Sequence, residues 1–282
     1  MKPMYFLSLL VVVLGMILAA PALAELAKPD TVPGEALTDE QMERFLMEAE
    51  VVDRQRLSVG VTGTFRLSMT DGTTTRNGHF QVIDESKPLF QGQAGNEINF
   101  RDCYKFNIAA YHLDRMINLN MVPVSVMRKV GGRTGAVTWW VEDVLMMERE
   151  RHLKKLSAPD TDKWNHQMFQ IRVFNELVYN TDANLTNLLI TKDWNIVPVD
   201  FSRAFRRHTT LKSPANLVRV DPRVYEGLKN LDAAEVEKRL KPYLMREEIR
   251  GLMARRDRIV EHFEKAIAAK GEGAVFIRPP GE

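Results

Sequence analysis

The sequence predicts an α+β protein with two lobes, in which a strand-rich N-terminal lobe precedes a mostly helical C-terminal lobe. Over residues 58–84 and 122–144, apolar residues alternate with polar ones or form short runs next to glycine turns, a pattern typical of strands. Beyond residue 147 the apolar residues recur mostly at intervals of three and four, the spacing of helices with one buried face. A crevice between two such lobes is a natural place for a ligand to bind.

In the N-terminal lobe the sequence predicts a leading helix and a β-hairpin. Thr38, with Gln41 three residues later, fits a capping box, and apolar residues at helical spacing extend this helix to Val52. Alternating apolar residues on both sides of Asp71-Gly72 predict the hairpin. The elements expected after it are a loop, a helix and two strands, at residues 86–99, 102–118, 122–130 and 136–144.

In the C-terminal lobe the sequence predicts two long helices with a short hairpin between them. The helix, the hairpin and the second helix are expected at residues 164–178, 188–199 and 249–267. The whole chain then divides into five parts. They are a signal peptide, a linker with the leading helix, the N-terminal lobe, the C-terminal lobe and a tail, at residues 1–24, 25–57, 58–146, 147–270 and 271–282.

Residues 1–24 have the pattern of a secretory signal peptide. Lys2 gives a positive start, residues 6–20 are almost entirely apolar, and Ala22-Leu23-Ala24 is a small-x-small cleavage site. The apolar run is 15 residues long, whereas a bilayer-spanning helix needs about 20. We therefore expect cleavage after Ala24 and an exported protein, periplasmic or secreted, with no stable membrane span after cleavage.

Charge and cysteine content narrow the function classes. The 282 residues include 39 Lys and Arg against 37 Asp and Glu, a net charge of +2. Proteins that bind nucleic acid usually have a clear basic surplus, so we expect no nucleic-acid partner.

Cys103 is the only cysteine in the chain, so no internal disulfide can form. We expect it to be a small packed residue rather than a reactive thiol.

The stretch that carries chemistry runs from Tyr179 to Phe205. It contains Asp182, Asn187 five positions later and Asp200 after another thirteen, with the predicted short hairpin between the last two. Phosphoryl transfer needs such a set, because one carboxylate orients the attacking hydroxyl while an amide oxygen and a second carboxylate hold Mg²⁺ against the phosphates. Polar loops rich in Asp and Asn are common in turns, but the hairpin and the Asp-Phe pair after it favour the catalytic interpretation.

The segments NTDANLTN and VDFSRAF resemble the atypical protein-kinase-like group, which includes phosphatidylinositol 3- and 4-kinases, HipA kinases and secreted Fam20 kinases. The resemblance is strongest over residues 164–205 and weaker over 58–146. It implies a two-lobed protein-kinase-like fold with ATP and Mg²⁺ as cofactors. It also implies that Asp182 is the catalytic base and that Asn187 and Asp200 are magnesium ligands.

The N-terminal lobe departs from the pattern of this group. Such kinases pair a Lys on the third strand, which grips the ATP phosphates, with a Glu on the next helix. In this sequence Gln81 stands at the Lys position and Asn107 at the Glu position. The amides could still bond to each other, but the positive charge is gone. Lys105 and Arg101, which are one helical turn apart, are the candidates to supply this positive charge. The alternative is that both are surface residues.

Three further stretches each have two interpretations. Gly60-Val61-Thr62-Gly63 is either a phosphate-covering loop or turn chemistry. Backbone groups near Glu142 and Val144 fall where the inter-lobe hinge should lie and would bind adenine, although the preceding Trp pair also suits packing. The basic stretch 203–208 binds an acidic or phosphate-bearing substrate, or it is a solvated loop.

The sequence therefore predicts an exported kinase-like phosphotransferase that moves the γ-phosphate of ATP to an unknown hydroxyl on a protein, lipid or small molecule. The alternative is a catalytically inactive pseudokinase that binds a nucleotide or a partner. The absent Lys–Glu pair and export to a compartment poor in ATP favour this alternative. The convergence of Asp182, Asn187 and Asp200 favours the enzyme.

Overall fold

The structure, a computed structural model, describes residues 37–57, 63–92 and 95–281. The predicted signal peptide, the first part of the linker and residues 60–62 of the predicted phosphate-covering loop lie outside these residues. Among the described residues, no helix is both long and apolar enough to cross a membrane.

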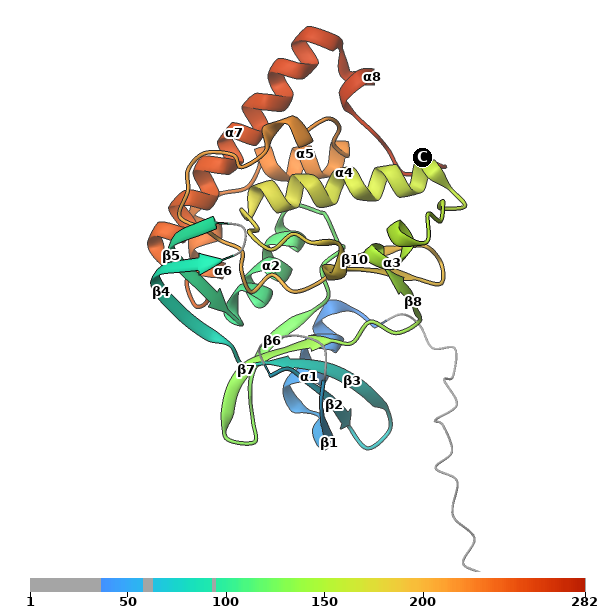
Figure 1. The fold of residues 1–282 in the computed structure, drawn as a ribbon, viewed down its shortest axis with the longest axis vertical. Helices are drawn as coiled ribbons and strands as arrows, with labels where there is room; N and C mark the ends of the chain where they lie inside the picture. The colour runs from blue at the N-terminus through green and yellow to red at the C-terminus, as the bar shows by residue number, and fades with distance from the viewer. Residues whose placement is uncertain (1–36, 58–62, 93–94, 282) are drawn as a thin grey trace, which may run out of the picture. The chain divides into compact units, whose positions relative to one another are not determined.

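The N-terminal lobe is built on a five-stranded antiparallel sheet with the strand order β1-β2-β3-β7-β6 (Figure 1). Its strands are β1 (Glu50–Arg56), β2 (Phe65–Thr70), β3 (Thr75–Gln81), β6 (Ser125–Val130) and β7 (Arg133–Trp139). Two helices, α1 (Asp39–Glu48) and α2 (Lys105–Met116), pack against β6 and β7.

Alternation along β3 separates a core face from a polar face. Phe80 is fully buried in the main core together with Leu67 and Met69 of β2. Successive side chains of a strand point to opposite faces of the sheet, so His79 and Gln81 lie on the other face. We call this the cleft face, because Gln81 contacts the segment that begins at Asp200.

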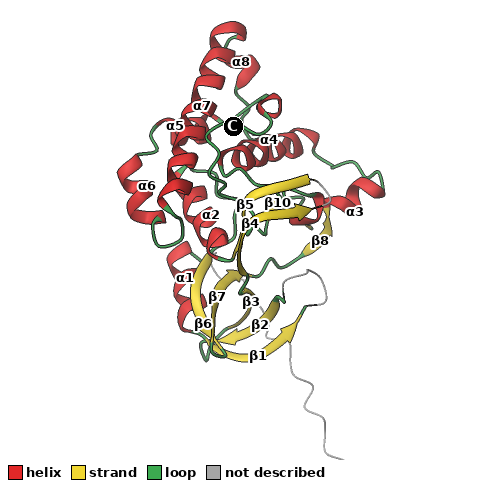
Figure 2. Cartoon of the chain, turned by 60° about the vertical axis from the view of Figure 1, so that its left-hand side comes forward, coloured by secondary structure: helices red, strands yellow, loops and turns green. Residues whose placement is uncertain are grey.

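The C-terminal lobe is mostly helical, with one small sheet of order β10-β9-β8 (Figure 2). The sheet contains β8 (Val144–Met147), β9 (Leu188–Thr191) and β10 (Ile196–Pro198). The helices are α3 (Glu148–Leu153), α4 (Thr161–Leu177), α5 (Pro222–Lys229), α6 (Ala233–Leu240), α7 (Arg246–Lys270) and α8 (Glu272–Val275). The short 3-10 turns η1 (Leu185–Asn187) and η2 (Pro214–Asn216) complete it.

The two lobes are joined at residues 140–143, between the end of β7 and the start of β8. The backbone N–H of Trp140 donates to the carbonyl of Asn77 on β3, and the Asn77 side chain donates to Glu142 Oε1 at 3.2 Å. The hinge is therefore attached to the cleft face of the N-terminal sheet, on the same strand that carries Gln81.

Most of the predicted elements are confirmed. The hairpin around Asp71-Gly72 is β2–β3, and the predicted strands that meet at Gly131-Gly132 correspond to β6–β7, although β7 ends at Trp139 and not at Val144 as predicted. The predicted helices correspond to α2, α4 and α7, and the short hairpin to β9–β10. The sequence-based expectation of an α+β fold with a strand-rich lobe followed by a helical one is confirmed.

Two local expectations are wrong. The leading helix ends at Glu48 rather than Val52, and β1 follows at once, because Glu50–Arg56 pairs along the edge of β2. Residues 86–92 and 95–99, expected in a loop, instead belong to two paired strands, β4 (Asp84–Gly92) and β5 (Gly95–Cys103). This hairpin is largely exposed, so its residues lack the alternation that marks a half-buried strand.

Candidate active site

The loop after α4 is closed by its own asparagines. Asn180 Nδ2 donates to Asn175 on α4 at 3.1 Å, while its Oδ1 accepts from the backbone N–H of Asp182 at 2.9 Å. Asn187 Nδ2 then donates to the backbone carbonyl of Asp182 at 3.1 Å. These bonds fix Asp182 and Asn187 at the two ends of one short turn.

Hydrogen bonds from the hairpin bring Asp200 beside this loop. The N–H of Val199 donates to the carbonyl of Asn187 at 2.9 Å. On the other side of Asp200, the carbonyl of Arg203 accepts from both the N–H and the hydroxyl of Thr181, at 3.2 and 3.0 Å. The segment holding Asp200 is therefore bonded on both sides to the segment holding Asp182 and Asn187.

The backbone of Asp200 has a φ of 57°, in the left-handed region. A residue other than glycine seldom adopts this conformation, and such residues concentrate at functional sites because the surrounding structure must hold them there. Here the hydrogen bonds from Val199 and Thr181 supply that restraint.

Each of the three predicted residues keeps an oxygen available for a ligand. Asp200 Oδ1 accepts two long bonds, from Gln81 Nε2 at 3.4 Å and from Ser202 N–H at 3.3 Å. Within the described parts of the chain, Asp200 Oδ2, Asn187 Oδ1 and Asp182 Oδ2 accept none. Carboxylate and amide oxygens are the ligands that Mg²⁺ prefers, and this ion usually takes its remaining ligands from phosphates and water. The donor set therefore fits Mg²⁺ held together with a nucleotide.

Gln81 and Asn107 meet beside Asp200 in a chain of hydrogen bonds. Asn107 Nδ2 donates to Gln81 Oε1 at 2.6 Å, and Asn107 Oδ1 accepts from the backbone N–H of Phe201 at 2.7 Å. Gln81 Nε2 completes the chain at Asp200. Gln81 is 1% exposed and Asn107 8%. We call this chain the amide relay. It joins β3, α2 and the Asp200 segment with no cation at either amide position.

The two candidate cations, Lys105 and Arg101, differ in their surroundings from the amide relay, and the two expected hinge residues lie at or next to the hinge. Lys105 is two positions from Asn107 on α2, a separation that points the two side chains about 200° apart. Arg101 is 9% exposed and pairs with Glu248 at 2.7 Å. At the hinge, Glu142 accepts from Asn77, and Val144 pairs with β9 at the edge of the C-terminal sheet.

The basic stretch that follows Asp200 is occupied by contacts within the chain. Arg203 pairs with Glu97 on β5 at 3.4 Å, and the buried Arg206 pairs with the same carboxylate. Glu97 thereby fastens the β4–β5 hairpin to the Asp200 segment. Neither of the two proposed alternatives, a solvated loop or a substrate-binding loop, describes these two arginines.

Two titratable groups near Asp200 carry no sequence signal. Burial raises the pKa of Asp102 on β5, and the neighbouring charge of Asp200 raises it further, while a Ser202 hydrogen bond lowers it. Burial lowers the pKa of His79, and the charge of Asp200 partly opposes this shift. Only the tertiary fold brings these groups together.

Cys103 is fully buried, and burial raises its pKa to about 12, so its thiol is not ionised at neutral pH.

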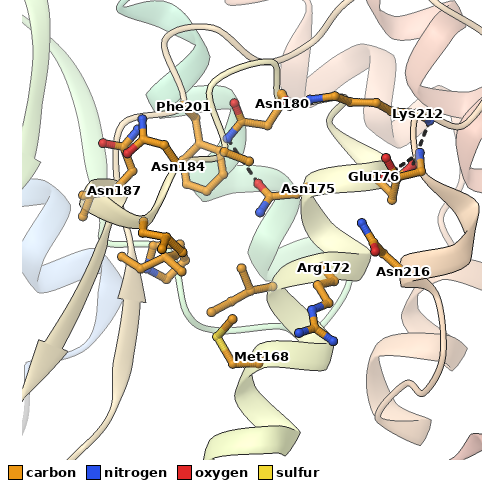
Figure 3. Close-up of a pocket in the computed structure, with 17 residues that line it drawn as sticks. Met168, Arg172, Asn175, Glu176, Asn180, Asn184, Asn187, Phe201, Lys212 and Asn216 are labelled. Atoms are coloured by element: carbon orange, nitrogen blue, oxygen red, sulfur yellow. Dashed lines mark hydrogen bonds between the residues drawn. The ribbon is translucent and has the colours of Figure 1, made fainter. Parts of the chain in front are cut away.

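A cavity of about 250 Å³ lies beside the loop that follows α4 (Figure 3). It is bounded by one side of α4, by the loop residues Asn184 and Asn187, and by the segment 212–216. Arg172 on α4 lines it, and Asn184 Nδ2 also donates to Asp182 Oδ1 at 3.1 Å. One residue that lines the cavity, Asn184, thus contacts Asp182, which does not itself line it.

Comparison with solved structures shows a kinase-like fold. A structure of hydra Fam20 with sugar has a TM-score of 0.66 at 16% identity, over 84% of this chain and 91% of that one. The Golgi casein kinase with Mn/ADP bound has a TM-score of 0.60 at 12% identity, over 86% and 80%. The Helicobacter pylori proinflammatory kinase CtkA has a TM-score of 0.50 at 10% identity, over 79% and 98%. No family model and no curated protein matches the sequence.

Proposed function

We propose that the protein is a kinase-like phosphotransferase that uses ATP and Mg²⁺. The observation that carries the proposal is the closure of the Asp182–Asn187 loop onto the Asp200 segment, together with the oxygen that each of the three residues keeps without a partner among the described residues. The Mn/ADP complex of the similarly folded Golgi casein kinase supports a nucleotide with a divalent ion as the ligand class.

In the proposed mechanism each residue has one task. Asp182 Oδ2 accepts the hydrogen of the acceptor hydroxyl and aims it at the γ-phosphate. Asn187 Oδ1 and Asp200 Oδ2 would hold Mg²⁺, which when bound neutralises charge on the transferred phosphoryl group. The amide relay holds the Asp200–Phe201 backbone in place. The cavity beside Asn184 gives the acceptor a place next to Asp182.

The alternative proposal, an inactive nucleotide- or partner-binding pseudokinase, is favoured by one observation. Gln81 and Asn107 form hydrogen bonds to each other and to Asp200 without any cation. These two residues can therefore serve as a purely structural contact above the site. Buried polar groups that are fully paired stabilise a fold whether or not catalysis takes place.

The test is magnesium-dependent ATP binding by the purified chain from Glu25 onward, followed by mass spectrometry for phosphate transfer. Binding with transfer to the chain itself or to an added acceptor supports the enzyme. ATP binding without phosphate transfer to any acceptor tested supports the pseudokinase. The absence of ATP binding contradicts the enzyme and the nucleotide-binding pseudokinase alike.

We also propose export, on the basis of the N-terminal 24 residues. Sequencing the N-terminus of the protein recovered outside the cytoplasm should give Glu25 as the first residue. Recovery of a membrane-bound chain that still carries residues 6–20 would contradict cleavage.

A further inference from the structure

The proposed site lacks the cation that would bind phosphate at position 81, and the nearby cations are engaged elsewhere. Arg101 is bonded to Glu248. Arg203 and Arg206 are both bonded to Glu97. Lys105 projects from the side of α2 opposite to Asn107. A charge for the nucleotide phosphates must therefore come from another element.

Arg66 on β2 lies on the cleft face of the N-terminal sheet. In the register of β2 with β3 it stands directly opposite His79, and directly opposed residues share one face of the sheet. His79 and Gln81 share that face by alternation. The diagonal neighbours of Arg66 on this face are Asn77 and Gln81, each about 7–8 Å away and somewhat closer between Cβ atoms, a span that an arginine side chain covers.

The charge of Arg66 is not neutralised by the described parts of the chain. Its guanidinium lies 5.0 Å from the centre of the Trp140 ring, but it has no ion pair there. Its Nε is buried and has no hydrogen-bond partner among the described residues. Arg66 as a whole is half-buried, so the rest of its guanidinium is open to a ligand, and the buried Nε–H would gain a partner from an anion that enters the site.

The position of Arg66 along the cleft face also suits a nucleotide. On β3, Asn77 is bonded to Glu142 at the hinge, and Gln81 is bonded to Asp200 at the proposed metal site. Arg66 faces His79, midway between these two ends. A ligand that reaches from the hinge to Asp200 must pass beneath this pair.

We propose that Arg66 is the phosphate-binding cation of this cleft and replaces, from β2, the charge that Gln81 does not provide. The ligand class is a nucleoside di- or triphosphate, bound through its phosphates. This inference rests on the proposed function for the identity of the cleft as a nucleotide site.

The test is calorimetric titration of wild type and Arg66→Gln with three probes: ADP, adenosine and inorganic pyrophosphate. A charged hydrogen bond to phosphate contributes roughly tenfold or more in affinity. We expect Arg66→Gln to weaken ADP and pyrophosphate binding by about that factor and to leave adenosine binding unchanged. Arg66→Lys keeps the charge but loses the planar fork of the guanidinium, so it should bind ADP and pyrophosphate more tightly than Arg66→Gln and less tightly than the wild type.

Arg54→Gln is the matched control, because Arg54 lies in the same sheet and also rests on an aromatic ring, 4.4 Å from the centre of Phe65. It should bind all three probes as the wild type does. The inference is overturned if Arg66→Gln binds ADP normally or loses adenosine to the same extent. It is also overturned if Arg54→Gln has the same effect, or if the wild type binds neither phosphate probe. Arg66-dependent pyrophosphate binding in a protein that transfers no phosphate would instead contradict the proposed enzyme and leave the inference in place.

Discussion

Two sets of residues face each other across the Asp200 segment, and they differ in how their polar atoms are paired. We call Asp182, Asn187 and Asp200 the floor of the cleft, and Gln81 and Asn107 its roof. On the floor, Asp182, Asn187 and Asp200 each have an oxygen with no partner among the described residues, and in our proposal these oxygens serve a metal ion and a substrate. On the roof, both amides of Gln81 and Asn107 are bonded within the protein.

This difference separates two tasks that a Lys–Glu ion pair would combine. An ion pair fixes the helix against the strand and also presents a positive charge to phosphate. The amide relay keeps only the first task, since Asn107 still holds the backbone of Phe201 and Gln81 still reaches Asp200. The second task passes, in our proposal, to Arg66. Substitutions on the floor should therefore affect metal binding and phosphate transfer. Substitutions on the roof should affect the position of the Asp200 segment, and a substitution at Arg66 should affect the attraction of phosphate.

The largest effect is expected for Asp200→Ala. Loss of its carboxylate removes a proposed metal ligand, so the magnesium-dependent part of ATP binding should disappear in calorimetry. Asp193→Ala, an exposed position in the β9–β10 turn, is the control and should bind as wild type does. Unchanged magnesium-dependent binding in Asp200→Ala would contradict the floor as described.

Asp182→Ala should separate binding from transfer. A base acts on the acceptor hydroxyl and not on the metal, so ATP binding should stay within about threefold of wild type while transfer falls by roughly 10²–10⁴-fold. Transfer is measured by mass spectrometry and binding by calorimetry on the same preparation. Equal loss of both quantities would show that Asp182 belongs to the binding site instead.

Rebuilding the ion pair should have an intermediate effect. The double substitution Gln81→Lys with Asn107→Glu restores a cation that a carboxylate positions, so it should bind ATP more tightly than either single variant. Residues in contact show non-additive effects, with interaction free energies of about 0.5–3 kcal/mol. Strictly additive changes in ATP affinity would contradict the coupling that the 2.6 Å hydrogen bond implies.

The smallest effect concerns the pH dependence of stability through His79. Burial lowers its pKa below 6.5 in the folded state, so the neutral form is favoured. Its contribution to stability is present above pH 6.5 and is lost as pH falls through the lowered pKa. Melting temperatures of His79→Gln should thus fall less than those of wild type on the acid side. His152→Gln, at an exposed position, should follow the wild type.

The local sequence predicts the floor of the site better than its surroundings. Asp182, Asn187 and Asp200 lie within nineteen residues of one another, and the turn and hairpin that connect them are local structures. The positions of Gln81 and Asn107 could be predicted because strand and helix patterns fix their order. That both amides would bond onward to the Asp200 segment could not, since those contacts span about a hundred residues.

The failures have the same physical origin. The β4–β5 hairpin has no sequence periodicity. Glu97 on this hairpin pairs with Arg203, which lies 106 residues later in the chain, and also with Arg206. The strand β1 pairs with the edge of β2, and its valines favour a strand, but Val52 also continues the helical spacing of the apolar residues before it. Arg66 was not predicted because its role depends on the register between two strands and on the missing charge at position 81.

The most direct test of the central claim is a titration of Mn²⁺ into the protein in the presence of ADP, followed by electron paramagnetic resonance of the free ion. We expect one Mn²⁺ to bind tightly only when ADP is present, and Asn187→Ala and Asp200→Ala each to abolish this binding. Arg66→Gln should weaken it through the loss of ADP. Nucleotide-dependent Mn²⁺ binding that survives both Asn187→Ala and Asp200→Ala would contradict the assignment of these residues as the metal site.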